Sequence, residues 1–234
     1  MIKCCNYDRK YPMAWDREDF SRAYRRLAPV YDHGLLLYEL VGMRLRRYRR
    51  EAVAGLHLQP GDTVVDLGCG TGVNLPLLLG AVGPTGRIIG VDLSPEMLEQ
   101  AQRKIDAEDW CNVELVASDM VDYVFPPHVD AVLATLALAT IPDYDSVIRT
   151  IASALPPGGR LANFEMTWPE AWPDWLVKLG AKLQQPFGVT TDLKDRKPAR
   201  SIQRHFARCD SSERYFGAIS FCIAIRQAGT GVNV

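Results

Sequence analysis

The sequence predicts an α/β fold, in which a mostly parallel β-sheet carries helices on both faces. Short apolar runs alternate with helical stretches between residues 63 and 166, as in repeated βαβ units. A loop containing three glycines follows the first of these runs. Near the C-terminus two further strand-like runs flank Gly217 with no helix between them, so this pair must be antiparallel.

The strands that precede this hairpin are short, apolar and partly β-branched, as buried parallel strands are. We expect them at residues 63–68, 87–93, 113–118, 129–137 and 160–166. Helices are expected between most of them, at residues 74–82, 94–108 and 143–155. Ser94 and Pro95 suit the N-cap and the first turn of the second of these helices. The alternation implies right-handed crossovers between parallel strands.

Two helical patterns precede the sheet. The first, at residues 15–32, places Phe20, Tyr24 and Leu27 on one face and is stopped by Pro29. We expect the second to be a single helix over residues 35–56. Its apolar face would carry Leu37, Leu40, Val41, Leu45 and Tyr48, and its polar face Arg44, Arg46, Arg47, Arg49 and Arg50. This basic face is either solvated or in contact with an anion or a membrane surface.

The 234 residues are 47% hydrophobic and 24% charged, which is enough for one large domain with a sizeable core. We expect a single domain over residues 1–234. Its parts would be an N-terminal helical extension, a ligand-binding core, an insertion and a C-terminal hairpin, at residues 1–58, 59–166, 167–209 and 210–234 respectively.

Charge is distributed unevenly along the chain. Residues 59–198 carry 10 Lys and Arg against 19 Asp and Glu, whereas both ends are basic. An acidic centre argues against nucleic acid as a partner, while the basic ends could meet an anionic substrate or membrane. The six cysteines show no metal-site spacing, so we expect reduced thiols and no metal. Without a signal peptide or a long apolar run, a location in the cytoplasm, either free or at a membrane periphery, is expected.

The glycine loop lies in the stretch VVDLGCGTGVNL, residues 64–75, at the carboxyl end of the first strand. Ligands bind at such strand ends, and glycines let them approach the backbone closely. A dinucleotide fits badly, because its G-x-G-x-x-G pattern needs glycine where Val73 stands. Asp66 would also repel a diphosphate, by about 1–4 kcal/mol at roughly 4 Å. A ligand that carries an ammonium group and no phosphate fits better.

Two more carboxylates follow at strand ends. Asp92 ends the second strand, where ribose-binding proteins place an acid that accepts hydrogen bonds from sugar hydroxyls. Asp119 follows the third strand and could accept from an adenine amino group, with Met120 against the ring. Together the three acids suit an adenosine joined to a cationic amino acid, which is S-adenosylmethionine (SAM).

The stretches VVDLGCGTG, VDLSPEML and ASDM, in this order and spacing, resemble the class I SAM-dependent methyltransferases over residues 61–159. The resemblance implies a Rossmann-like, doubly wound seven-stranded sheet of order 3-2-1-4-5-7-6, with strand 7 antiparallel. It also implies that SAM is held by the residues Tyr24, Tyr31, Asp66, Gly68, Cys69, Gly70, Gly72, Asn74, Asp92, Leu93, Met97, Ser118, Asp119, Met120 and Thr135. Among these, Asp66 and Gly68 would hold the methionine end.

The N-terminal AYRRLAPVYD resembles a narrower small-molecule branch, with ubiquinone/menaquinone and phosphatidylethanolamine N-methyltransferases. That resemblance places Tyr24 and Tyr31 near the cofactor; the alternative is a core-facing helix. Many relatives carry His-His after the fourth strand, but this chain has Ala139 and Thr140. The Asn-Pro-Pro loop of exocyclic-amine methyltransferases is absent after that strand, which argues against adenine-N6, cytosine-N4 and protein-glutamine targets.

The sequence therefore predicts methyl transfer to a small apolar or lipid-like acceptor, such as a quinol, a phospholipid amine or an aromatic metabolite. The alternatives are a SAM-binding protein without catalysis and a protein methyltransferase. No catalytic residue is assigned, and the candidates for a general base are His33, Glu165 and His205. The oligomeric state stays open.

The tryptophans of the insertion are the last feature singled out. Trp168, Trp172 and Trp175 lie within eight residues, and Trp172 and Trp175 would share a helix face. They serve as core, as an apolar acceptor pocket or as an interfacial anchor. We expect the insertion and the N-terminal helices to fold over the cofactor as a lid.

Overall fold

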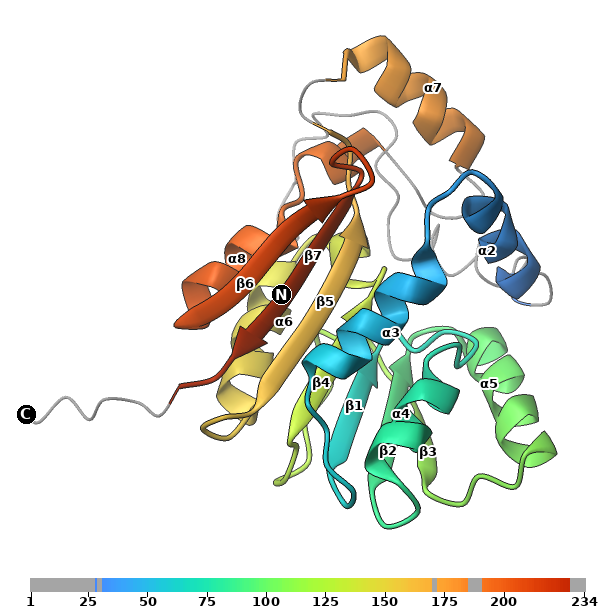
Figure 1. The fold of residues 1–234 in the computed structure, drawn as a ribbon, viewed down its shortest axis with the longest axis vertical. Coiled ribbons are helices and arrows are strands. Elements are labelled where there is room, and N and C mark those ends of the chain that lie inside the picture. The colour runs from blue at the N-terminus through green and yellow to red at the C-terminus, as the bar shows by residue number, and fades with distance from the viewer. Residues whose placement is uncertain (1–27, 29–30, 170–171, 185–190, 228–234) are drawn as a thin grey trace, which may run out of the picture.

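The protein contains one seven-stranded β-sheet, as Figure 1 shows. The computed structural model describes residue 28 and residues 31–169, 172–184 and 191–227. The strands are β1 (Thr63–Leu67), β2 (Arg87–Asp92), β3 (Val113–Ala117), β4 (Ala131–Thr135), β5 (Arg160–Met166), β6 (Arg208–Arg214) and β7 (Ile219–Ile225). Their order is β3-β2-β1-β4-β5-β7-β6, and β7 runs antiparallel to both β5 and β6. The predicted strand order and hairpin are confirmed.

Helices cover both faces of the sheet (Figure 1). They are α2 (Tyr31–Leu40), α3 (Leu45–Gly55), α4 (Leu75–Val82), α5 (Pro95–Ala107), α6 (Tyr144–Ala154), α7 (Asp174–Gln184) and α8 (Pro198–His205), with short 3-10 turns at Leu138–Thr140 and Thr191–Lys194. Alternate residues of β1 enter opposite cores: Val64 packs with α3 and α4, and Val65 with α6 and α8. None of the helices among the described residues is both long and apolar enough to span a bilayer.

The segment between α2 and α3 corrects the prediction of one continuous helix over residues 35–56. Gly42 has φ +84°, and Met43 N donates to Tyr38 O at 2.9 Å while Gly42 N donates to Glu39 O at 3.0 Å. This is the Schellman arrangement that ends a helix at a glycine in the left-handed region. The chain therefore turns a corner at Gly42, and α3 starts in a new direction at Leu45.

Both predicted faces of that helix are also wrong in part. Leu37, Leu40 and Val41 were expected to be buried, but their exposed fractions are 58%, 81% and 63%. Arg49 was expected on the solvated face, but only 6% of it is exposed. The corner separates α2 from α3, so the apolar side chains of the two helices do not form one continuous stripe. The predicted first helix lies mostly outside the described residues, as do Phe20, Tyr24, Leu27 and Pro29.

The tryptophans of the insertion divide between core and surface. Trp168 is buried, and its ring centroid lies 6.0 Å from that of Trp172. Both pack with α7 and with Ala139 in a small apolar cluster. Trp175 is 67% exposed, and Trp172 precedes α7, so the predicted shared helix face is wrong. For Trp168 and Trp172 the structure favours the core interpretation.

Candidate functional site

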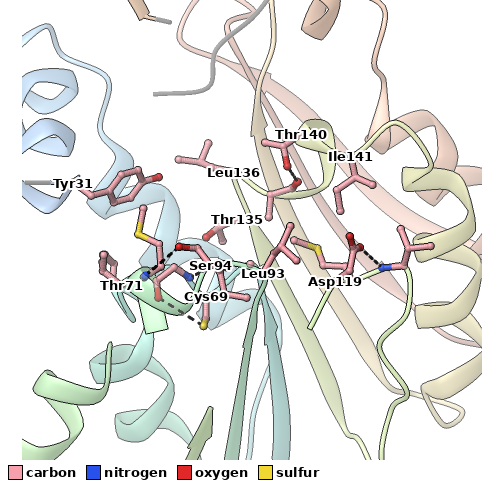
Figure 2. A pocket seen from close by; sticks show the side chains of 18 of the residues that line it. Tyr31, Cys69, Thr71, Leu93, Ser94, Asp119, Thr135, Leu136, Thr140 and Ile141 are labelled. Carbon is pink, nitrogen blue, oxygen red and sulfur yellow. Dashed lines mark hydrogen bonds between the residues drawn. The ribbon is translucent and has the colours of Figure 1, made fainter. Parts of the chain in front are cut away.

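A cavity of about 450 Å³ opens beyond the carboxyl ends of β1, β2 and β4, a size typical of small-molecule and cofactor sites. Figure 2 shows side chains that line it from several loops and from α2. The lining residues are Tyr31, Arg49, Gly68, Cys69, Gly70, Thr71, Val73, Asp92, Leu93, Ser94, Met97, Asp119, Met120, Val121, Thr135, Leu136, Ala137, Thr140, Ile141, Pro142 and Asp143.

The glycine loop gives a ligand access to bare backbone. Gly68 has φ +70°, and a Cβ there would lie 2.5 Å from Ala137 Cβ and 2.9 Å from Met120 Cε. A glycine at this position thus lets three loops meet. Gly70 has φ +56°, and a Cβ there would have no neighbour within 4 Å. This side of Gly70 is therefore open, and the residue also lines the cavity.

Asp92 is fixed in the wall by two backbone hydrogen bonds. Gly70 N donates to Asp92 Oδ2 at 2.8 Å, and Ser94 N donates to Oδ1 at 2.9 Å. Burial raises the pKa of Asp92, although these bonds oppose the shift. Each carboxylate oxygen keeps a second acceptor position, so the side chain can receive two ribose hydroxyls. Ser94 caps α5 as predicted, through a bond from Met97 N at 3.3 Å.

Apolar side chains and one carboxylate line the part of the cavity around Leu93 and Asp119, which are labelled in Figure 2. Leu93, Met97 and Met120 line it, and Asp119 Oδ1 accepts from Val121 N at 2.8 Å. Leu93 is 42% exposed, so its side chain is open to a ligand in the cavity. A flat apolar ring with a donor amine, such as adenine, suits these surroundings.

Arg49 is the principal lining residue that the sequence analysis missed. Its Nη1 donates to Asn74 Oδ1 at 2.8 Å and to Thr135 Oγ1 at 2.7 Å. Both partners are neutral, and a buried cation without a close counter-charge is costly. A signal for this position was present, because Arg49 lies four residues after Leu45 and three before Ala52, at the spacing of a buried helix face.

Asp66 is placed behind the wall rather than in the lining. It is fully buried, and Asn74 Nδ2 donates to both of its oxygens at 3.0 Å. Burial raises the pKa of Asp66 to about 7, against the effect of Asn74 and of Arg49. Asp66 is therefore linked to the cavity lining only indirectly, because it bonds to Asn74 and Asn74 bonds to Arg49. Gly72, Asn74 and Ser118, which were also predicted to hold the cofactor, lie outside the lining as well.

Glu165 supports the wall formed by the loop after β4. Its Oε1 accepts from Leu138 N at 2.8 Å, from Asn163 Nδ2 at 2.8 Å and from Ala137 N at 3.2 Å. Burial raises the pKa of Glu165 to about 7. The carboxyl faces backbone rather than the cavity lining, so its geometry is that of a positioning residue and not of a base.

The remaining predicted site residues are two histidines and two tyrosines, and only one of the four is described as lining the cavity. His205 ends α8, and its Nε2 lies 3.2 Å from Asp145 Oδ1, outside the cavity lining. His33 is in α2 but its side chain is not described, and Tyr24 lies outside the described residues. Tyr31 does line the cavity, and burial raises its pKa.

Helix α2 is attached to the cavity wall at its first turn. Asp32 Oδ1 accepts from Thr71 Oγ1 at 2.6 Å, and its Oδ2 accepts from Lys104 Nζ at 2.6 Å. These contacts join α2 to the glycine loop and to α5. They hold Tyr31, the neighbour of Asp32, at the cavity (Figure 2).

Comparison with known proteins agrees with this geometry. Residues 64–159 match the family model described as a methyltransferase domain. A demethylmenaquinone methyltransferase from Listeria welshimeri is 29% identical over 160 residues, which cover 68% of this chain and 66% of that protein. The chain therefore matches just under two thirds of the length of this curated relative.

Solved structures share the fold at low sequence identity. A phosphoethanolamine N-methyltransferase 2 from Haemonchus contortus, bound to phosphomonomethylethanolamine and S-adenosylhomocysteine, superposes with a TM-score of 0.67. The identity is 17%, over 88% of this chain and 60% of that one. A SAM-dependent methyltransferase from Aquifex aeolicus gives 0.53 at 18% identity, over 76% and 89%.

The sheet order, the glycine loop followed by Asp92, and the matched domain all agree on one cofactor. That cofactor is SAM, and residues 64–159 form a methyltransferase domain similar to those of the class I SAM-dependent methyltransferases.

Proposed function

We propose that the chain transfers a methyl group from SAM to a small apolar or lipid-like acceptor, such as a quinol, a phospholipid amine or an aromatic metabolite. The observation that carries this proposal is the mixed lining of the cavity. The glycine loop, Asp92 and Arg49 supply bare backbone and charge, and Leu136, Ala137 and Ile141 supply apolar side chains. The first group suits a charged nucleoside, and the second suits an apolar acceptor.

The residues that would hold SAM follow from the geometry of the lining. Asp92 receives the ribose hydroxyls, and Asp119 with Met120 receives the adenine. Arg49, a buried guanidinium with two neutral partners, receives the methionine carboxylate. Asp66 balances the charge of Arg49 through Asn74 and lies on the side of the methionine end. When bound, SAM supplies an activated methyl group on a sulfonium.

The protein's share of the chemistry is alignment and exclusion of water. The titratable residues among the described lining residues are Tyr31, Arg49, Cys69, Asp92, Asp119 and Asp143. Three of these, Arg49, Asp92 and Asp119, are already assigned to the cofactor. Thr140 donates its hydroxyl to Ala137 O at 2.6 Å, so it can accept from the acceptor. An acceptor that arrives with a neutral nucleophile needs no more than this.

The N-terminal segment, residues 1–58, would act as a lid whose described part is α2 and α3. The support is the contact of Asp32 with Thr71 and Lys104, which brings Tyr31 to the cavity. Residues 167–209 would back the acceptor side, because Trp168 and α7 pack on Ala139. The tryptophans do not line the cavity, so acceptor contact is assigned to Leu136 and Ile141 instead.

The names of two similar proteins support a small-molecule acceptor, but they do not identify which small molecule it is. One relative is called a demethylmenaquinone methyltransferase, and one structural neighbour a phosphoethanolamine N-methyltransferase. Both names describe methyl transfer to a small molecule, one a quinone precursor and the other a phosphorylated amine. We take the class of small acceptors from this pair and leave the individual acceptor to experiment.

The test is a transfer assay with methyl-labelled SAM and a panel of quinols, phospholipids, phenols and amines. Label in one of these acceptors is the expected result, and Leu136→Ala should raise the KM of that acceptor more than it changes SAM affinity. Tight SAM binding with no transfer would favour a SAM-binding protein without catalysis. Label found only in added protein would favour a protein methyltransferase, and either outcome overturns the proposal.

A further inference from the structure

A second cavity, of about 520 Å³, lies where the start of α3 meets the turn between β6 and β7. None of its described lining residues belongs to the lining of the cofactor cavity. We call it the basic hollow, and its lining residues are Gly42, Arg44, Arg47, Tyr48, Glu51, Arg214, Tyr215 and Phe216. In Figure 1 the two elements that form it come from opposite ends of the chain.

One face of α3 supplies half of this lining. Arg44, Arg47, Tyr48 and Glu51 are spaced i, i+3, i+4 and i+7, which places them on a single helix face. Arg49 points instead to the cofactor cavity. Of the arginines predicted to form one basic face, Arg44 and Arg47 therefore line the hollow and Arg49 lines the cofactor cavity.

The charge of the hollow is positive. Three guanidinium groups face one carboxylate, and Glu51 is shared between Arg47, at 2.7 Å, and Arg214. Arg214 is held in place, because its Cζ lies 4.1 Å from the ring centroid of Phe221 and 5.6 Å from that of Tyr48. A stacked, paired arginine of this kind loses little freedom when it binds a phosphate.

The rim of the hollow is apolar and exposed. Leu40, Val41 and Phe216 have exposed fractions of 81%, 63% and 89%. Tyr215 donates its hydroxyl to Val41 O at 2.5 Å, which ties the corner between α2 and α3 to the hairpin turn. The exposed apolar residues therefore stand beside the arginines. A soluble anion would leave these apolar side chains in water, whereas the acyl chains attached to a lipid phosphate would cover them.

We propose that the basic hollow binds the phosphate of an anionic phospholipid headgroup, with Leu40, Val41 and Phe216 entering the apolar layer of the membrane. Arg44, Arg47 and Arg214 supply the charge. The inference does not depend on the acceptor, since the hollow and the cofactor cavity are lined by different residues in the part of the chain that the structure describes. It places the protein at a membrane surface, where a lipid-like acceptor would be found.

The experiment is sedimentation of the full chain with vesicles, either of pure phosphatidylcholine or with added phosphatidylglycerol. We expect retention only on the anionic vesicles, weakening as salt is raised. The variant Arg44→Gln/Arg47→Gln should lower the vesicle affinity at least about tenfold, since each arginine near the surface contributes roughly 1 kcal/mol. Binding at wild-type affinity by this variant would overturn the proposal.

The matched control is Arg103→Gln. Arg103 forms an i,i+4 pair with Glu99 at 2.7 Å on α5, as Arg47 does with Glu51 on α3, but it lies outside the hollow. It should leave vesicle binding unchanged, and SAM affinity should be unchanged in every variant of this series. An equal loss on Arg103→Gln would mean diffuse charge attraction and would overturn the specific site.

Phe216→Ser separates a lipid from a free phosphate. We expect it to weaken vesicle binding while inorganic phosphate binding, measured by calorimetry, stays as in the wild type. If Phe216→Ser leaves vesicle binding intact while the arginine variant loses inorganic phosphate, the ligand is a soluble anion. Preferential binding of an RNA oligonucleotide over anionic vesicles would likewise contradict the lipid assignment. Phe216 is almost fully exposed, so a folding defect is not expected.

Discussion

The cofactor cavity has two walls of different construction. On one side, loops at the ends of β1, β2 and β4 are fixed by backbone hydrogen bonds, as between Gly70 N and Asp92 or between Leu138 N and Glu165. On the other side, α2 and α3 are joined to the sheet by side chains, through Asp32 and Arg49. The first wall consists of loops that directly follow strands of the sheet, and the second consists of two helices that precede the sheet in the chain.

The largest expected effect is on the second wall, at its buried end. Arg49→Met should lower the free energy of unfolding by about 3 kcal/mol, because Asn74 Oδ1 and Thr135 Oγ1 stay buried without the guanidinium that donates to them. Urea denaturation measures this loss. The variant should also weaken SAM more than adenosine, since only SAM carries a carboxylate. Full stability in Arg49→Met would show that these two buried hydrogen bonds do not stabilise the fold.

A pH effect is expected from the first wall. Burial raises the pKa of Glu165 to about 7, so the folded chain keeps a proton that the unfolded chain loses above about pH 4.3. The free energy of unfolding should therefore fall as pH rises from about 4 to 7. Glu165→Gln should make this slope shallower, by up to about 1.4 kcal/mol per pH unit. Denaturation of both proteins at pH 5 and pH 7 tests this, and identical slopes would contradict it.

Asp92 tests the first wall as a binding surface. Asp92→Ala should cost about 1–3 kcal/mol of SAM affinity, because two ribose hydroxyls lose a charged acceptor. Calorimetry measures the loss, with Asp106→Ala on the exposed side of α5 as the control. Unlike the Arg49 variant, Asp92→Ala should weaken SAM and adenosine equally, and a loss confined to SAM would refute the ribose assignment.

The first wall is also the part that the sequence could predict. Strands β1 to β5, the glycine loop and the cap at Ser94 are confirmed, because apolar runs, glycines and capping residues act over a few neighbouring positions. Asp92 and Asp119 were placed in the lining for the same reason, since each directly follows or ends a predicted strand.

The second wall could not be predicted from the same local patterns. The chain turns at Gly42, where α2 ends, and α3 starts in a new direction. The sequence analysis treated both as one helix, and for that reason it placed Arg49 on the polar face although the residue is buried. Likewise Trp172 precedes α7 instead of belonging to it, which removed the face it was predicted to share with Trp175. The partners that bury Arg49, Asn74 and Thr135, are 25 and 86 residues away.

The smallest effect is expected at the exposed attachment of α2. Asp32→Asn should speed SAM release a few-fold, while changing the free energy of unfolding by less than about 1 kcal/mol, because half-exposed ion pairs contribute little. Stopped-flow displacement of SAM measures the release rate, and Lys104→Met should act in the same direction. Unchanged release in both variants would mean that α2 does not cover the cofactor.

Calorimetric titration with SAM and with NADH tests the central claim most directly. The cavity is lined by carboxylates, a buried arginine and a glycine loop. This combination predicts SAM binding in the micromolar range, about −8 kcal/mol, and no binding of NADH. Val73 lines the cavity at the position where the dinucleotide-binding pattern has its third glycine. Binding of NADH without binding of SAM would contradict the account.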